Sequence, residues 1–243
     1  MDEARKTNLV RDAGFIRAFL SKRVIDIGCG ADLVVAHAEP FDLQHGDAQF
    51  ILNHHSAESF DTVHSSHCLE HMRDVEPALL GWWSLVRPGG HMIVVVPEED
   101  LYEQGSWPSL FNKDHKATFR LNRPTRWSRH SYDLGALAAA LPDADVISTE
   151  IQDAGYNRQM MHRRITGWGR LLHRLAKRRG KLFYRLSRLG LSLVSLDHAM
   201  DRLEQRAGKP IDQTRGDALA QIQVIVRKQP HLPRRTPLPP GKG

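Results

Sequence analysis

The apolar positions of the chain fall into short continuous runs and into longer segments with helical spacing. A short apolar run is typical of a buried strand, whereas apolar residues three or four apart are typical of a helix with one buried face. We expect strands at 23–27, 40–43, 49–52, 60–64, 91–96, 145–152 and 219–227. We expect helices at 10–22, 71–86 and 131–140, the last capped by Ser131. This alternation predicts an α/β fold with a doubly wound, mostly parallel, seven-stranded sheet covered on both faces.

Two segments depart from a regular alternation. The connection between the strands that end near Asp26 and Asp42 is short, so we expect no full helix between them. The last predicted strand, 219–227, begins with alternating polar and apolar residues, which is typical of an edge strand.

The first predicted strand ends in an acidic residue and two spaced glycines, Asp26, Gly28 and Gly30. Glycine lets the backbone turn sharply and approach a ligand closely, because it has no Cβ atom. A dinucleotide-binding turn would carry a third glycine where Leu33 stands, which disfavours a nicotinamide or flavin cofactor. A carboxylate at a strand end can instead face an ammonium group. We expect Gly28→Val to abolish ligand binding while the chain stays folded.

Two further motifs follow in order. Residues 59–71 contain F-D-x-V and then L-E-H, and residues 85–97 contain a P-G-G turn followed by an apolar strand. With the D-x-G-x-G turn, this succession resembles class I S-adenosylmethionine-dependent methyltransferases, most closely the small-molecule branch called methyltransferase type 11. The resemblance covers residues 20–157 and resumes at 217–228. It implies the Rossmann-like methyltransferase fold, with an antiparallel last strand, and S-adenosyl-L-methionine as cofactor.

The same resemblance implies cofactor-binding residues in the first turn. Asp26 should meet the methionine ammonium group, directly or through water. Gly28 and Gly30 should pass under the methionine and ribose, with Cys29 between them.

Further cofactor contacts are implied after the next strands. Asp42 resembles the acidic residue that accepts hydrogen bonds from the ribose hydroxyls, because a carboxylate has two oxygens that can both accept. Glu39 competes for that role, and a solvated loop aspartate is the alternative. Asp47 and Ala48 resemble the pair that contacts the adenine amino group, although Gly-Asp also favours an ordinary turn.

Three residues after the strand at 60–64 complete the predicted cofactor site: Ser65, Ser66 and His67. Ligands of such sheets bind outside the carboxyl ends of the strands. We therefore expect these side chains to line the methyl end of the cofactor.

Methyl transfer from a sulfonium needs alignment and exclusion of water more than covalent help. A hydroxyl acceptor also needs a general base. The long polar and aromatic loop at 97–116 supplies the first candidate, His115, whose unperturbed pKa is near neutral and which Asp114 can orient. His67 is the second candidate and Glu98 the third. Anchoring of the loop by Asp114 and His115 is an equally good interpretation.

Fourteen histidines also raise the question of a metal site. His64, His67 and His71 lie close in sequence to His54 and His55, and His67 and His71 are four residues apart, as on one helical face. However, the chain has no Cys/His spacing of a zinc site, and the resemblance makes L-E-H a structural helix start. We therefore expect no bound metal.

Composition bounds the class of protein. A chain of 243 residues fits one large domain, or one domain with an insertion. Cys29 and Cys68 are its two cysteines, and we expect them to be buried or site-lining thiols in a reducing cytosol. The charged N-terminus lacks the apolar stretch of a signal peptide, and no apolar run is long enough to span a bilayer. We expect a cytoplasmic protein, with a peripheral membrane position left open.

Positive charge is concentrated in one segment. Lysine and arginine exceed acidic residues by 34 to 28, yet residues 154–196 contain no acidic residue at all. At helical spacing, seven cations share one face opposite a row of leucines: Arg170, Arg174, Lys177, Arg178, Lys181, Arg185 and Arg188. This pattern at 168–189 is typical of a helix at an anionic membrane surface. A lid with solvated arginines and a site for an acceptor phosphate are the alternatives.

These segments divide the chain into four expected parts. Residues 1–157 form the S-adenosylmethionine-binding core, 158–216 a basic helical insertion, 217–228 the final strand and 229–243 a disordered tail rich in proline and arginine.

We expect an S-adenosylmethionine-dependent methyltransferase that acts on a small-molecule or lipid- or sugar-linked acceptor, with oxygen as the favoured atom. Enzymes that methylate base or amide nitrogens usually carry Asn/Asp-Pro-Pro-aromatic after the fourth strand, where this chain has Ser65-Ser66-His67-Cys68. Carbon acceptors in quinone-like substrates remain open. The basic insertion and a pI near 9.5 favour a nucleic-acid methyltransferase as the alternative, but few aromatic residues are available for base stacking. A non-catalytic scaffold and a dehydrogenase fit the motifs less well.

Overall fold

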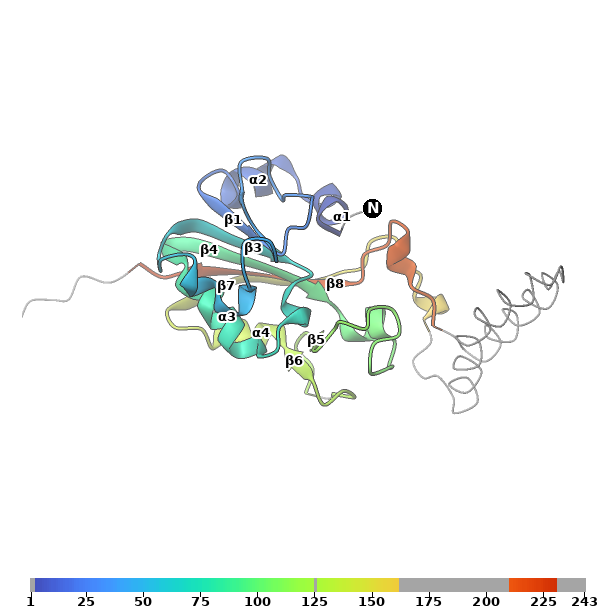
Figure 1. Ribbon diagram of the computed structural model, residues 1–243. Coiled ribbons are helices and arrows are strands. Elements are labelled where there is room, and N and C mark those ends of the chain that lie inside the picture. Colours follow the sequence, from blue (N-terminus) through green and yellow to red (C-terminus); the bar gives the residue numbers. More distant parts are fainter. Residues whose placement is uncertain (1–2, 125, 162–209, 231–243) are drawn as a thin grey trace, which may run out of the picture.

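The computed structural model describes residues 3–124, 126–161 and 210–230. Within these ranges a six-stranded sheet has the order β2-β1-β3-β4-β8-β7, and a small second sheet pairs β5 with β6 (Figure 1). The strands of the main sheet are β1 (Val24–Ile27), β2 (Glu39–Phe41), β3 (Phe60–Ser66), β4 (Val86–Pro97), β7 (Ala144–Gln152) and β8 (Gln221–Lys228). The pairs among β1, β2, β3 and β4 are parallel, and β8 is antiparallel to both its neighbours. The expected fold class and the antiparallel last strand are confirmed.

Helices cover both faces of the sheet, as Figure 1 shows. On one face lie α1 (Glu3–Leu9) and α2 (Ala13–Phe19). Residues of α2, among them Ile16, pack against a small apolar cluster that includes Leu20 and Ile93. On the other face, α3 (Val75–Ser84) and α4 (Leu134–Ala139) pack on the main core, to which α3 contributes Trp82 and Trp83. Because both faces are covered, β3 and β4 are buried along most of their length.

The connection between β1 and β2 contains no helix, as expected from its length. The Asp26 carboxylate holds it down from inside, since its Oδ2 accepts a hydrogen bond from Val34 N at 2.7 Å. The Gly28 backbone N–H donates to Phe41 O, which ties the glycine turn to β2.

The predicted strand at 49–52 is wrong, and the main sheet has six strands instead of seven. These residues form a 3₁₀-helix, Ala48–Asn53, which Asp47 caps by accepting a hydrogen bond from Gln49 N. The indole of Trp82 donates to Ala48 O at 2.8 Å, which fastens the helix to α3. A short apolar run does not distinguish a strand from a buried helical turn, and here tertiary packing decided between them.

The last strand, β8, is also not at an edge, because it pairs with β4 on one side and β7 on the other. Its polar residues Gln221 and Gln223 are buried and hydrogen-bonded to side chains from α1 and the segment that follows it. The alternating polar residues of β8 therefore make buried hydrogen bonds to the N-terminal segment and do not mark an edge strand.

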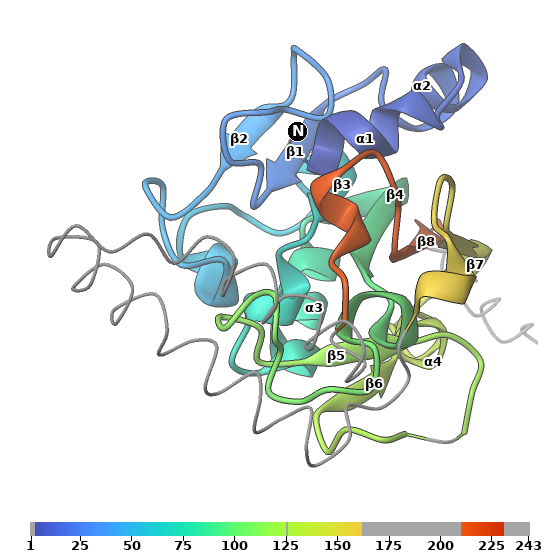
Figure 2. The ribbon, with the colours of Figure 1, turned by 90° about the vertical axis from the view of Figure 1, so that its right-hand side faces the viewer.

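The helix boundaries differ from the prediction in three places. The predicted helix at 10–22 corresponds to α2, and α1 is a separate helix before it. The predicted helix at 71–86 corresponds to α3, which is preceded by a 3₁₀-turn at Leu69–His71. The segment 131–140 begins as β6 (Ser131–Asp133), paired with β5 (Thr118–Arg120), and α4 is capped by Asp133 instead of Ser131. Ser131 instead accepts a hydrogen bond from Arg120. Figure 2 shows this small sheet near α4.

The basic face at 168–189 and the tail from 231 onward lie outside the described residues, as does most of the expected insertion. In the part of the chain that the structure describes, no helix has the length and apolar character needed to cross a bilayer.

Candidate functional site

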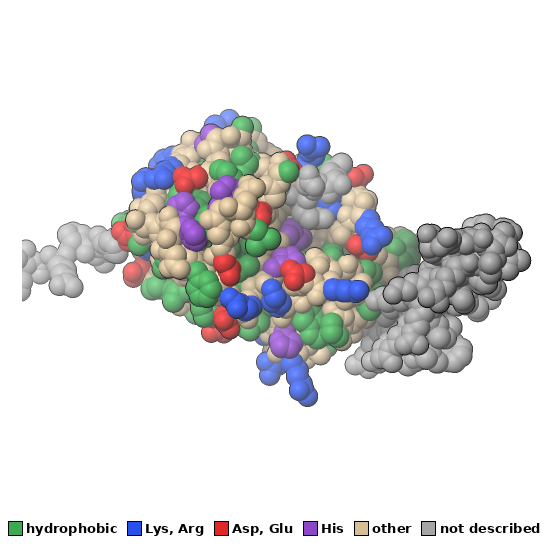
Figure 3. All heavy atoms as spheres, viewed as in Figure 1, with side chains coloured by type: hydrophobic (Ala, Val, Ile, Leu, Met, Phe, Trp, Pro, Cys, Tyr) green, Lys and Arg blue, Asp and Glu red, His purple; other side chains and the backbone are tan. Residues whose placement is uncertain are grey.

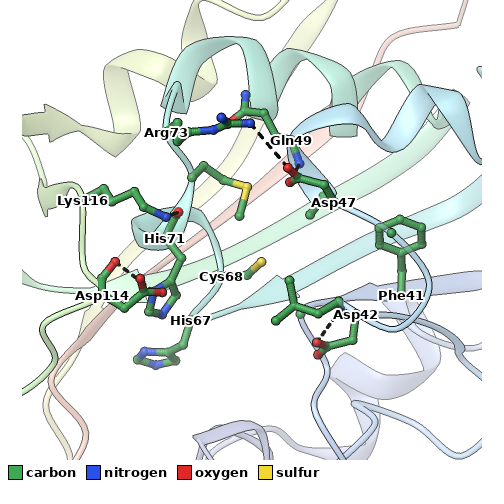
Figure 4. Close-up of a pocket in the computed structure, with 15 residues that line it drawn as sticks. Phe41, Asp42, Asp47, Gln49, His67, Cys68, His71, Arg73, Asp114 and Lys116 are labelled. Atoms are coloured by element: carbon green, nitrogen blue, oxygen red, sulfur yellow. Dashed lines mark hydrogen bonds and ion pairs between the residues drawn. The ribbon is translucent and has the colours of Figure 1, made fainter.

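A cavity of about 390 Å³ opens at the carboxyl ends of β1, β2 and β3. This volume lies in the range of roughly 300–1,000 Å³ that is usual for small-molecule sites. Its walls come from Gly28, from the segment 41–49, from the residues after β3, and from Asp114 and Lys116. Figure 4 shows the two ends of the cavity, with acidic side chains at one end and imidazoles at the other.

The acidic end contains Asp42 and Asp47, both expected at the cofactor. Asp42 follows β2, and its two carboxylate oxygens accept hydrogen bonds from Gly30 N and Leu43 N, each at 2.7 Å. Asp47 caps the 3₁₀-helix and lies 3.6 Å from the Arg73 guanidinium (Figure 4). Gly28 and Ala48 line the same end of the cavity.

The opposite end is formed by His67, His71 and Asp114. His71 Nδ1 lies 3.0 Å from Asp114 Oδ2, and the Lys116 ammonium donates to His71 O at 2.6 Å. His67 has a left-handed backbone with φ +54°, and its Nε2 lies 3.0 Å from Gln221 Oε1.

Six of the expected site residues lie beside the cavity without lining it: Asp26, Cys29, Gly30, Ser65, Ser66 and His115. Gly30 is bound to the cavity wall through Asp42. Ser65 and Ser66 are buried, and their hydroxyl oxygens have no hydrogen-bond partner of normal geometry among the described residues. Burial raises the pKa of the Cys29 thiol, as do the nearby carboxylates of Asp26 and Asp42.

Asp26 lies in a buried polar chain that the sequence did not reveal. It is 1% exposed, and its Oδ1 lies 2.6 Å from His64 Nδ1. Both terminal nitrogens of the Arg11 guanidinium lie 3.3 Å from His64 Nε2. Arginine can only donate, so Nε2 accepts and the proton of a neutral His64 is on Nδ1, directed at Asp26. Residues 11, 26 and 64 are far apart in the sequence, and no local pattern connects them.

We expect His64 to stay in the neutral Nδ1–H form below pH 6.5, near which an unperturbed histidine titrates. Burial lowers the pKa of His64, and the attraction of Asp26 does not compensate for it. Because the pKa of His64 is lower in the folded protein than in the unfolded chain, protonation of His64 favours unfolding. The free energy of unfolding therefore falls as the pH drops below the unfolded-state pKa toward the folded-state pKa. Imidazole ¹⁵N shifts across pH 5–8 measure the tautomer directly. Titration of His64 at or above pH 6.5 would contradict the assignment.

A second buried cluster surrounds Glu70 at the imidazole end. Three ring nitrogens face Glu70 Oε1: His67 Nδ1 at 3.5 Å, His71 Nε2 at 4.0 Å and His115 Nε2 at 4.0 Å. The ligand atoms of Glu70, His71 and His115 all lie within 4.8 Å of one another. Burial alone would raise the pKa of Glu70, but the three histidines outweigh it and lower that pKa below its ordinary value.

The partner of His115 is Glu103, whose Oε1 lies 2.7 Å from His115 Nδ1. The expectation that Asp114 orients His115 is therefore corrected, because Asp114 binds His71 instead. Glu70 and Glu103 are functional candidates that sequence reasoning missed. The E-H pair in L-E-H was the available signal, but it was taken for a helix start.

Glu98, the third base candidate, does not line the cavity. It caps the helical turn Glu99–Glu103 through hydrogen bonds from Asp100 N and Leu101 N, and its Oε1 accepts from Arg123 at 2.7 Å. Burial raises the pKa of Glu98 to about 7, against these hydrogen bonds. Its contacts are those of a structural cap.

Comparison with known proteins agrees with this arrangement. The family model described as a methyltransferase domain matches residues 3–146. No curated protein sequence matches the chain at the significance required.

Three solved structures are similar to the chain at low identity. A putative methyltransferase from Bacillus halodurans is 11% identical, with 94% of this chain and 99% of that chain covered and a TM-score of 0.45. The YcgJ protein from Bacillus subtilis is 15% identical, with 94% and 99% covered and a TM-score of 0.44. A putative sarcosine dimethylglycine methyltransferase from Galdieria sulphuraria is 13% identical, with a TM-score of 0.37. The match covers 82% of this chain but 62% of that one, less than two thirds of its length.

The family model covers more than half of the chain, and the matched region contains the glycine turn, the cavity and both polar clusters. This protein therefore belongs to the methyltransferase-domain family.

Proposed function

We propose that this enzyme transfers the methyl group of S-adenosylmethionine to a hydroxyl oxygen of a small molecule, free or linked to a lipid or sugar. The observation that carries the proposal is the polarity of the cavity. Carboxylates that suit the cofactor lie at one end, and imidazoles that suit proton transfer lie at the other.

The acidic end fits the nucleoside of the cofactor. Each oxygen of Asp42 already accepts one backbone hydrogen bond, and a carboxylate oxygen has a second lone pair for a ribose hydroxyl. We assign Asp47 and Ala48, which line the same cavity, to the adenine. The hydroxyl of Ser66, buried at the end of β3 without a hydrogen-bond partner among the described residues, is a candidate donor for the methionine part.

The imidazole end favours an oxygen acceptor. The end of β3 and the two residues that follow it read Ser65-Ser66-His67-Cys68, which has no pair of prolines to shape a site for an amino group. A hydroxyl acceptor needs a base to remove its proton, and histidine is the side chain whose ordinary pKa suits that task near neutral pH.

We assign proton transfer to His67, because it lines the cavity whereas His115 lies behind it. Both ring nitrogens of His67 face side-chain oxygens: Nε2 lies 3.0 Å from Gln221 Oε1, and Nδ1 lies 3.5 Å from Glu70 Oε1. In the transfer step the sulfur–carbon bond of the cofactor breaks and the carbon–oxygen bond forms. The hydroxyl proton passes to the imidazole of His67, and Glu70, whose Oε1 lies 3.5 Å from Nδ1, stabilises the resulting imidazolium.

Replacing His67 by alanine is expected to lower kcat by about 10²- to 10⁴-fold, the usual contribution of a general base. The affinity for S-adenosylmethionine, measured by calorimetry, should stay within a few-fold of wild type because Asp42 and the glycine turn are intact. His130→Ala, an exposed histidine outside the cavity, is the matched control. Unchanged turnover in His67→Ala would remove the base role.

The acceptor class is tested with [methyl-³H]S-adenosylmethionine and extracts of cells separated into aqueous and lipid fractions. Labelled products are then treated with mild base, which releases methanol from methyl esters but leaves ethers and N-methyl groups intact. A base-stable methyl ether supports the proposal, whereas a base-labile methyl ester would show a carboxylate acceptor and overturn it. Label found in RNA or on amine nitrogen would overturn it.

A further inference from the structure

The cluster around Glu70 holds more acceptor groups than donors. Glu70 is 1% exposed, and neither of its carboxylate oxygens has a hydrogen-bond partner of normal geometry among the described residues. A buried carboxylate is costly unless donors or a cation face it, and here only three histidine ring nitrogens do, at 3.5–4.0 Å from Oε1. Figure 3 shows histidine side chains gathered next to acidic ones on this face of the molecule.

Two neighbouring histidines have their other ring nitrogen already engaged by a carboxylate. Asp114 Oδ2 lies 3.0 Å from His71 Nδ1, and Glu103 Oε1 lies 2.7 Å from His115 Nδ1. In the neutral rings these acceptors fix the proton on Nδ1. The lone pairs on Nε2 of both rings then face Glu70 Oε1, each at 4.0 Å. Three electron-pair donors thus converge on one point with no proton between them.

We propose that Glu70, His71 and His115 bind one divalent transition-metal ion at the imidazole end of the cavity. Two imidazoles and one carboxylate are a common donor set for Zn²⁺, Fe²⁺, Mn²⁺ and Co²⁺, whereas Mg²⁺ and Ca²⁺ prefer oxygen alone. Carboxylates behind both histidines are the outer partners that orient metal-binding imidazoles and raise their basicity.

The distances are compatible with closure around an ion. With metal–ligand bonds of about 2.0–2.2 Å, ligand atoms lie roughly 3.0–3.5 Å apart, against at most 4.8 Å here. The difference requires movements of about 1 Å. The side chain of His71 is 25% exposed, so it is the ligand at the open side of the cluster.

The backbone already holds the three ligands together. Lys116 N and Ala117 N both donate to Glu70 O, at 2.8 and 3.2 Å, so the loop that carries His115 is fastened to the turn that carries Glu70 and His71. The rings of His71 and His115 are 5.1 Å apart at 75°. A site built on such fixed segments requires little reorganisation on binding.

The position of the ion deepens the proposed function, on which this part of the inference rests. His71 lines the cavity, so a remaining coordination position faces the space for the acceptor. There a metal would bind the acceptor hydroxyl and lower its pKa before His67 takes the proton.

The test is Co²⁺ and Zn²⁺ binding to the tag-free, full-length protein after treatment with a chelator. We expect one Co²⁺ per chain with visible ligand-field bands, displaced by Zn²⁺. Glu70→Gln and His115→Ala should abolish the bands. Glu103→Gln should weaken binding about 10–100-fold, because it removes only an outer partner. His37→Ala with His130→Ala, two exposed histidines, is the matched control and should bind as wild type.

Binding that survives Glu70→Gln, or that disappears in the His37/His130 control, would overturn the site. So would nitrogen NMR shifts showing His71 and His115 doubly protonated at neutral pH with saturating Zn²⁺ present. Circular dichroism of each chelated variant separates loss of metal from loss of fold. Calorimetry of S-adenosylmethionine binding in the presence of chelator tests the proposed methyltransferase function independently of the metal site. Cofactor binding and methyl transfer without any metal affinity would reject the metal site alone.

Discussion

Replacing Gly28 by alanine is expected to lower the free energy of unfolding by about 2–5 kcal/mol, a large part of the total for a domain of this kind. A Cβ atom at Gly28 would lie 2.5 Å from Cys68 Cβ and 2.7 Å from Cys68 Sγ. The backbone also has φ +75°, which costs a residue with a side chain about 1–2 kcal/mol, and overpacking of a filled space adds about 1–3 kcal/mol. Urea unfolding measures the loss.

Two variants show whether the contact with Cys68 is the cause. Gly30→Ala carries a similar strain, at φ +57°, but nothing lies within 4 Å of its Cβ. It should therefore cost only about 1–2 kcal/mol. The double variant Gly28→Ala with Cys68→Gly removes the colliding atoms and should recover part of the loss in a double-mutant cycle. Equal losses for Gly28→Ala and Gly30→Ala would show that the collision does not matter.

This result would correct the expectation that a side chain at Gly28 affects only the ligand. Gly28 does line the cavity, but the space in which its Cβ would lie is occupied by the protein itself. Loss of cofactor binding in Gly28→Val would follow from displacement of the turn, together with a loss of stability.

Replacing Asp26 by asparagine is expected to lower the free energy of unfolding by about 1–3 kcal/mol, the usual cost of leaving a buried donor without its acceptor. The Asp26 oxygens accept from Val34 N and from the protonated Nδ1 of His64. An asparagine has one oxygen, so its NH₂ group must face one of these donors. A change of the His64 tautomer would then point Nε2–H at Arg11, which only donates.

The control for this variant is Asp145→Asn. Asp145 Oδ2 lies 2.5 Å from Arg227 Nη2 on the surface, and the two side chains are 34% and 46% exposed. Such pairs contribute about 0–1 kcal/mol. If the two variants are equally stable in urea, the buried chain of Asp26, His64 and Arg11 is not a stabilising element.

Much of this protein was predictable from its sequence, and the reason is that the evidence was local. The apolar runs that became β1, β3, β4 and β8 are local signals, and so is the glycine turn after β1. The predicted turn at Pro88-Gly89-Gly90 is wrong, because these residues lie inside β4, where the register against β3 shifts. The fold class and the position of Asp42 and His67 just beyond strand ends follow from these signals, because parallel strands bring their carboxyl ends to one edge. The antiparallel last strand was implied by the family resemblance, and Asp47 caps a 3₁₀-helix instead of ending a strand.

Tertiary contacts decided the rest. Residues 49–52 became helical because Trp82 binds Ala48 O from α3, and β8 became an interior strand because β7 pairs with it from the far side. The partners of Asp26 and of His115 could not be predicted, because Arg11, His64 and Glu103 reach them only after the sheet has formed. By itself the sequence determined the fold class and the methyltransferase motifs. Only the tertiary structure decided which buried carboxylate meets which histidine, since that depends on side chains that are distant in sequence and enclosed by the same core.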